Sequence, residues 1–279
     1  MLGTFFAKPL LVPNRLALLV PNRLHCWCQD NLMELNLGKC KVMTYHTIRN
    51  PYIYLYTLDN TPLIRVNQIK DLGITFDQNL KFNTHYMNIK RKALRFLGFL
   101  YRHTQDFRNT NTLKILYYAY VRSGLEYCSV VWSPQYNVHI KSIESVQHKF
   151  LRTIAYRQKN PIVNHEYNNI MQTNNIMSLE NRRKLQDLIF LFKILRNRID
   201  SSELLEQINF RANSRRTRLN HTFKNNRSHT NLAQSCPIRR IQDLGNIIGS
   251  AGVDIFHCSD NELINAFNDF FFFLMIHGN

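Results

Sequence analysis

Acidic side chains are scarce in this sequence. The chain has 19 Asp and Glu residues against 36 Lys and Arg residues, so its formal net charge at pH 7 is +17 and its isoelectric point is about 9.8. A charge of this size must be solvated or neutralised by a polyanion, and nucleic acid is the usual polyanion. We therefore expect a nucleic-acid partner, and a merely basic globular protein is the alternative.

Cysteine and long apolar runs are lacking too. Six cysteines in 279 residues are too few for a disulfide framework, and the amino terminus does not resemble a secretory leader. The most apolar stretch, residues 270–276, is far shorter than the roughly 18 residues that a membrane span needs. These absences predict an intracellular protein without a membrane segment, in either the nucleus or the cytoplasm.

Common catalytic motifs are missing as well. The sequence contains no G-x-S-x-G, no phosphate-binding loop and no H-E-x-x-H, so hydrolases and nucleotide-dependent enzymes have no positive signal. Cys26, Cys28, Cys40 and His46 could be combined into a zinc site, but the first spacing is tighter than that of a usual zinc knuckle. We predict no metal and no cofactor.

What the sequence does contain is a basic amphipathic stretch at residues 68–102. An apolar segment with β-branched residues, Ile69–Phe76, is interrupted by Gly73 and is followed by a helical pattern. Arg91, Arg95 and Arg102 share one face of that helix. We expect this face to offer its cations to an anion while another face packs. The packing face has five apolar residues, which are Tyr86, Ile89, Ala93, Phe96 and Leu100.

Strand patterns precede this helix. Residues 39–45 alternate polar and apolar side chains. Residues 52–66 place aromatic and β-branched residues on both sides of the pair Asp59-Asn60, which predicts a β-hairpin. Together with Ile69–Phe76 these segments are predicted to form one small antiparallel sheet. A short helix, ended by residues 36–38, is expected to pack on the sheet through Trp27, Leu32 and Leu35.

The remainder is predicted to be helical, so the expected fold class is α+β and mostly α. Apolar residues at helical spacing mark four more helices. Their stripes are Leu113, Leu116, Tyr117 and Tyr120; Ile140, Ile143, Gln147, Phe150 and Ile154; Leu185, Leu188, Ile189, Phe192, Leu195 and Ile199; and Leu263, Ile264, Phe267, Phe270, Phe271 and Leu274. Lys141, Lys149 and Arg152 lie outside the second stripe.

Breaks between these helices can also be predicted. The first helix is expected to end near Ser123-Gly124, and Pro134 is expected to end a short apolar element before the second. Ser178 is a predicted cap of the third helix, with Glu180 in its first turn. The asparagine-rich residues 160–175 are predicted to form a linker or a long loop.

Residues 207–242 contain no acid and little hydrophobic periodicity. A one-signed block of this kind does not fold on itself easily and more often lies on an anion. Its Arg215, Arg216 and Arg218 are weaker candidates for contact with RNA or DNA than the helical stripe. Nearer the carboxy terminus, the four phenylalanines of Phe270–Phe273 predict a surface that a protein partner covers.

Several motifs, taken in order, resemble one family. Together they are similar to jockey-type reverse transcriptases of non-LTR retrotransposons, in the region that follows the polymerase palm, and the resemblance runs from about Leu24 onward. The motifs are W-C-Q-D-N-L-M-E-L-N-L-G-K-C at 27–40, D-L-G-I-T-F-D at 71–77, L-Y-Y-A-Y-V-R-S-G-L-E-Y-C-S-V-V-W-S-P at 116–134, I-E-S-V-Q-H-K-F-L-R at 143–152, S-C-P-I-R-R at 235–240 and D-I-F at 254–256.

The resemblance implies a domain organisation. The duplicated LVPNRL hexapeptide and its two prolines predict a poorly ordered leader at residues 1–24, and the resemblance places the distal edge of the palm at residues 25–80. Residues 81–159 correspond to the thumb helices, and residues 160–279 form a carboxy-terminal helical region that includes the basic segment.

The resemblance also assigns roles to residues. Leu72 and Gly73 fall at the primer grip of the family, and Lys39 falls at a palm lysine that assists pyrophosphate release. The family's thumb holds template and primer by their backbones, which is the role implied for Arg91, Arg95 and Arg102. The family's catalytic Y-x-D-D turn is absent from this sequence, so we expect no polymerase activity and no catalytic residues in this chain.

Three hypotheses on function stay open at this point. The first is a truncated, non-catalytic protein that binds nucleic acid through its thumb-like helices. The second is an incomplete gene model of an active RNA-directed DNA polymerase, which would carry Y-x-D-D upstream. The third is an inert transposon relic, or a scaffold that recruits a protein through the Phe270–Phe273 surface.

Overall fold

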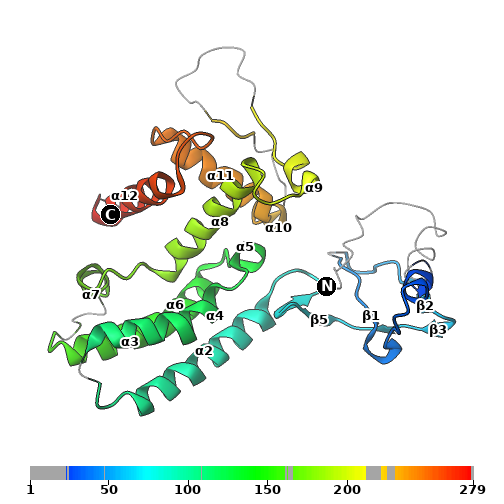
Figure 1. Ribbon diagram of the computed structural model, residues 1–279, viewed down its shortest axis with the longest axis horizontal. Coiled ribbons are helices and arrows are strands. Elements are labelled where there is room, and N and C mark those ends of the chain that lie inside the picture. The colour runs from blue at the N-terminus through cyan, green and yellow to red at the C-terminus, as the bar shows by residue number, and fades with distance from the viewer. Residues whose placement is uncertain are drawn as a thin grey trace. The chain divides into compact units, whose positions relative to one another are not determined.

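The computed structural model describes residue 23 and residues 25–46, 48–107, 109–160, 162, 166–211, 221–224 and 230–277. These residues are mostly helical with small sheets, which confirms the predicted fold class (Figure 1). The chain forms two compact units, Met1–Met87 and Asn88–Asn279. The duplicated hexapeptides of the expected leader lie outside the described residues, apart from Arg23.

The strands of the first unit are short and pair two by two. The prediction of one antiparallel sheet is wrong, because the described strands form three separate two-stranded sheets and one of them is parallel. Pairing stops after two residues in two of the sheets and after four in the third, and none of the described strands pairs with a third. The pairs are β1 (Lys41–Val42) with β4 (Ile64–Arg65), β2 (Thr57–Leu58) with β3 (Thr61–Pro62), and β5 (Gln68–Asp71) with β6 (Ile74–Asp77).

Both antiparallel pairs are tight hairpins. The hairpin predicted at Asp59-Asn60 is confirmed, and the two residues have φ angles of 50° and 55°. Left-handed backbone at both central positions matches the right-handed twist of the strands, and Asp and Asn tolerate it better than most residues. The β5–β6 hairpin turns at Leu72, with φ 44°, and Gly73, with φ 89°.

The first helical segment departs from its predicted packing. Residues 25–30 are helical, but the prediction that Trp27 and Leu32 pack on a sheet is wrong, since their side chains are 52% and 95% exposed. Cys28 is the buried residue of this turn. The helix ends well before residues 36–38, and Leu32 already has left-handed backbone at φ 53°. A separate 3-10 turn, η1, follows at Leu37–Lys39, where the Asn36 side chain accepts a hydrogen bond from the Lys39 amide.

The second unit is built from helices, and α2 begins in the first unit and continues into the second (Figure 1). The helical elements are α2 (Asn83–His103), α3 (Thr110–Tyr117), the π-helical η2 (Tyr118–Arg122), α4 (Ser123–Glu126), α5 (Ser129–Trp132), α6 (Asn137–Arg157), α7 (Asn168–Thr173), α8 (Leu179–Leu195), α9 (Ser202–Glu206), α10 (Asn231–Gln234), α11 (Pro237–Ser250) and α12 (Asp260–His277).

Helix α6 lies in a packed core between α3 and α8. The Tyr117 ring stacks on Phe150 at 3.9 Å between centroids, and its hydroxyl bonds to the Gln147 side chain at 3.1 Å. Gln147 in turn donates to the Met177 carbonyl at 3.0 Å, which ties α6 to the residues that enter α8. Every polar group in this chain of contacts is satisfied, as burial requires.

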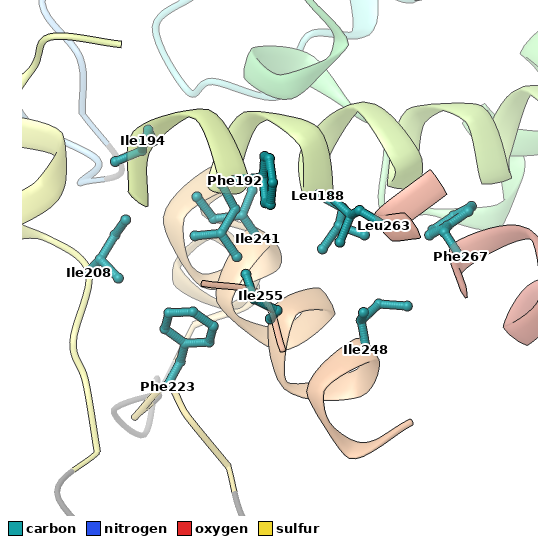
Figure 2. Packing of buried hydrophobic residues seen from close by; sticks show 11 residues of the cluster. Leu188, Phe192, Ile194, Ile208, Phe223, Ile241, Ile248, Ile255, Leu263 and Phe267 are labelled. Atoms are coloured by element: carbon teal, nitrogen blue, oxygen red, sulfur yellow. The ribbon is translucent and has the colours of Figure 1, made fainter. Parts of the chain in front are cut away.

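A second apolar cluster joins α8, α11 and α12 (Figure 2). Phe223, from the segment before α10, inserts its ring beside α11 close to Gly245. The Asn246 side chain accepts from the Phe223 amide at 2.9 Å and donates to its carbonyl at 3.0 Å. The cluster consists of Leu188, Leu191, Phe192, Ile194, Ile208, Phe223, Ile241, Ile248, Ile255, Leu263 and Phe267.

Element boundaries follow the prediction in some places and not in others. Ser178 caps α8 by accepting from the Asn181 amide, as predicted. The predicted loop at residues 160–175 instead contains α7, because Ile170 and Met171 bury their side chains there. The helix predicted to end near Ser123-Gly124 continues from the π-helical η2 into α4 and ends at Glu126, two residues later.

Candidate nucleic-acid interface

Helix α2 has one buried face and one exposed face. Ala93, Leu97 and Leu100 are at most 6% exposed and point inward. The sequence prediction that Phe96 belongs to the packing face is wrong, since its ring is 37% exposed and the buried role falls to Leu97. Successive residues of a helix are about 100° apart around its axis. The predicted face, which included Ile89 and Phe96, is therefore rotated about the helix axis relative to the face that is actually buried.

Arg91, Arg95 and Arg102 all lie on the exposed face of α2, opposite the buried residues. The helix contains no acidic residue, so none of these arginines can pair along it in the usual i, i+4 manner. An arginine stripe without intrahelical partners keeps its guanidinium groups available to an external anion.

Helix α6 runs beside α2 in the same direction (Figure 1). Near the start of α6, the Lys90 ammonium donates a hydrogen bond to the Ser142 hydroxyl at 2.8 Å. These two residues are 52 positions apart in the sequence. At the other end, Arg157 donates to the Thr104 carbonyl at 2.8 Å, a separation of 53. Because the sequence separation of the contacting residues stays nearly constant from one end to the other, α2 and α6 are parallel.

Helix α6 adds a second basic stripe, formed by Lys141, Lys149 and Arg152, all of which are exposed. On α2 the arginines lie roughly a third of a turn clockwise from the contact residue Lys90, viewed from the amino end. On α6 Lys141 and Arg152 lie roughly a quarter turn anticlockwise from Ser142, and Lys149 lies about 20° from Ser142 in the same direction. Since the helices are parallel and face each other, these opposite rotations place both stripes on the same side. We call these six residues the α2–α6 basic face.

The α2–α6 basic face has no exposed acid. Glu144 is the single acidic residue of the two helices. Its carboxylate accepts from the Leu179 amide at 3.2 Å on the side of α6 that faces α8, and burial raises its pKa. The face is therefore uniformly cationic, and sequence reasoning missed its α6 half because the register between helices 52 positions apart leaves no local signal.

The other candidate residues lie elsewhere. Lys39 is exposed at the end of η1, and Leu72 and Gly73 form the exposed turn between β5 and β6, all in the first unit. Their implied roles stay predictions. Arg215, Arg216 and Arg218 lie outside the described residues.

The predicted Phe270–Phe273 surface is only partly described. Phe270 is half-buried and packs against the cluster of α8, α11 and α12, so this ring has an intramolecular partner. The side chains of the next three phenylalanines lie outside the described part of the chain.

Other charged groups of the second unit form internal pairs. Glu126 bonds to Arg182, and the second bond of this bidentate pair is 2.9 Å long. Asp187, 1% exposed, accepts from the Arg240 Nε at 2.6 Å, and burial raises its pKa although the bond to Arg240 lowers it. Arg182 and Arg240 thus hold α4, α8 and α11 together through internal carboxylate partners.

Two further properties concern the described residues as a whole. They contain no group of three or more His, Cys, Asp or Glu side chains that could hold a metal ion. None of their helices is both long enough and apolar enough to cross a membrane.

Comparison with known proteins adds no neighbour. No family model, no curated protein and no solved structure matches this sequence.

Proposed function

We propose that the α2–α6 basic face binds the sugar-phosphate backbone of nucleic acid without reading its sequence. The observation that carries the proposal is the gathering of six exposed Lys and Arg side chains from two parallel helices on one acid-free side. Phosphate contacts from such side chains fix a protein on nucleic acid and carry no base information. The motif resemblance to the post-palm region of non-LTR retrotransposon reverse transcriptases supports the same role, as a thumb.

The dimensions of the face suit a short stretch of backbone. With a separation of 52 positions, Lys141 lies level with residue 89 of α2, so the face extends over about 13 helical positions to Arg102. At a rise of about 1.5 Å per residue it is roughly 20 Å long, which corresponds to about six nucleotides at 3.4 Å each. Six cations thus face a comparable number of phosphates.

Salt dependence tests the proposal. We expect binding of short oligonucleotides, followed by fluorescence anisotropy, to weaken steeply as salt is added, because each phosphate contact releases a counterion. The triple change Arg91→Ala, Arg95→Ala and Arg102→Ala should weaken binding about tenfold or more and reduce the slope of log affinity against log salt by about two to three units. The loss should be the same for all sequences.

A charge-matched variant separates the face from the net charge. Arg49→Ala, Lys70→Ala and Lys81→Ala remove three exposed cations from the first unit, so net charge falls equally. This control should bind almost as tightly as the unchanged protein. The α2–α6 basic face is not the binding site if the two triple variants lose equal affinity, or if the affinity does not change with salt concentration.

We further propose that the chain itself does not polymerise. The support is the absence of Y-x-D-D, whose carboxylates hold the two metal ions of polymerase chemistry in the family that the motifs resemble. The purified protein should leave an annealed primer unextended in the presence of Mg²⁺ and nucleotides. Primer extension would instead favour the RNA-directed DNA polymerase hypothesis.

A further inference from the structure

One aromatic side chain on α6 is placed where packing cannot explain it. Tyr156 is 84% exposed, more than any other described Phe, Tyr or Trp. By contrast Phe150 and Ile154 of the same helix are at most 2% exposed. A ring in this position keeps its apolar faces accessible to an external contact.

The surroundings of Tyr156 are cationic. Arg152 lies one helical turn before it and Lys149 two turns before it, on the same exposed side of α6. Lys159, also exposed, lies two residues after the end of the helix. With a helix separation of 52 to 53 positions, Tyr156 lies level with the carboxyl end of α2, where Arg102 projects from the same side.

The end of α2 offers a second exposed ring. Phe99 is 50% exposed and contacts the His103 ring, with ring centroids 4.2 Å apart and the ring planes tilted by 44°. Phe99 neighbours both Arg95 and Arg102 at helical spacing, so each helix of the pair combines aromatic and cationic side chains at the same end. Interleaved rings and cations are the surface that single-stranded nucleic acid uses, because the cations follow the phosphates and the rings stack on unpaired bases.

We propose that the α2–α6 basic face selects single-stranded over duplex nucleic acid by stacking an unpaired base on Tyr156. The proposal rests on the proposed function, since the cations supply the attraction, and it adds the class of ligand and the residue that selects it. In a duplex the faces of the bases are occupied by their neighbours, so the Tyr156 ring has nothing to stack on. A single strand can turn one base out and cover the ring.

Substitution of Tyr156 gives the first test. With an oligothymidylate of about twelve nucleotides, Tyr156→Ala should lose about tenfold in affinity, within the roughly 5- to 150-fold range of a stacked base. Tyr156→Phe should retain the affinity, because stacking needs the ring and not the hydroxyl. Tyr136→Ala is the matched control, since this tyrosine is 61% exposed at the other end of the same helix and lies off the basic stripe.

An oligomer of the same length with abasic sites gives the second test, because it keeps the phosphates and removes the bases. The unchanged protein should bind it about as weakly as Tyr156→Ala binds oligothymidylate, and Tyr156→Ala should show no further loss. If the protein binds duplex and single strand equally, or if Tyr156→Ala matches Tyr136→Ala, this inference fails while the salt-dependent function stands. If the arginine variant also binds normally, the proposed function fails as well.

Discussion

His85 is a buried imidazole at the start of α2. It is 3% exposed, and its Nδ1 accepts a hydrogen bond from the Thr75 amide of β6 at 3.3 Å. Burial lowers the pKa of His85 to about 4, because the low-dielectric surroundings disfavour the charged ring. The ring is therefore neutral in the folded protein at neutral pH, with the proton on Nε2.

This pKa predicts how the stability of the first unit depends on pH. Between the unfolded pKa of about 6.5 and the folded value of about 4, the unfolded chain binds a proton at this site and the folded chain does not. Stability should therefore fall as pH drops through this window, by on the order of 2 kcal/mol between pH 7 and pH 5. Above the window the stability should not depend on the titration of His85. Urea unfolding at pH 7 and pH 5 measures the difference.

The variant His85→Asn supplies the control. Its side-chain oxygen can still accept from Thr75, but it does not titrate, so its stability should fall less between pH 7 and pH 5 than that of the unchanged protein. A histidine resonance of residue 85 that titrates near 6.5 by NMR would contradict the prediction.

At the scale of elements, two glycines of α11 give a matched pair. A Cβ at Gly245 would lie 2.6 Å from a Phe223 ring carbon and 2.8 Å from a Leu191 methyl carbon. A Cβ at Gly249 would meet only the Thr222 hydroxyl oxygen, at 3.8 Å. The missing side chain of Gly245 therefore leaves the space that the Phe223 ring occupies. At Gly249 no ring or methyl group occupies the corresponding space.

We expect opposite effects when these glycines become alanine. Gly245→Ala should destabilise the protein by about 1–3 kcal/mol, because overpacking outweighs the helix propensity that alanine gains. Gly249→Ala should be neutral or stabilise by up to about 1 kcal/mol. Thermal or urea unfolding of both variants measures the two effects, and a stabilising Gly245→Ala would show that Phe223 moves aside without cost.

The elements that could be predicted are those with strong local signals. The stripe of α6, most of the stripe of α8, the Ser178 cap and the Asp59-Asn60 hairpin follow from spacing and turn chemistry within a few residues, although α8 ends at Leu195, before the predicted Ile199. Helix α12 was also predictable, and the structure describes the side chains of its stripe up to Phe270. The pairing of β1 with β4 could not be predicted, because it joins segments more than 20 residues apart through very few bonds. Helix α7 was predicted as a loop because its segment is rich in asparagine, but tertiary contacts bury Ile170 and Met171 there.

The candidate site divides in the same way. The shared face of Arg91, Arg95 and Arg102 follows from helical spacing alone, and the structure leaves all three exposed. Their alignment with Lys149 and Arg152 depends on the parallel packing of α2 and α6, which polar contacts 52 to 53 positions apart hold in place. Such a register is a tertiary property, so a single sequence without neighbours cannot supply it.

At the scale of the whole molecule, the two units differ in how well they bury apolar surface. In the first unit Tyr52, Ile53 and Leu55 are 65–75% exposed. In the second unit Val146 and Leu188 are fully buried, and Leu188 belongs to the cluster of α8, α11 and α12. Local stability follows buried apolar contact, so the second unit should resist opening more strongly than the first.

Native-state hydrogen exchange should reveal this difference along a single helix. The amides of α2 from Asn88 to His103 belong to the second unit and should exchange slowly, together with α6. The amides of the β5–β6 hairpin should exchange faster, because its two strands have no third partner among the described strands. Mass spectrometry of peptides from both regions compares them within one sample. Uniform protection across the two units would mean that they open as one cooperative body, and the basic face would then depend on the first unit for its stability.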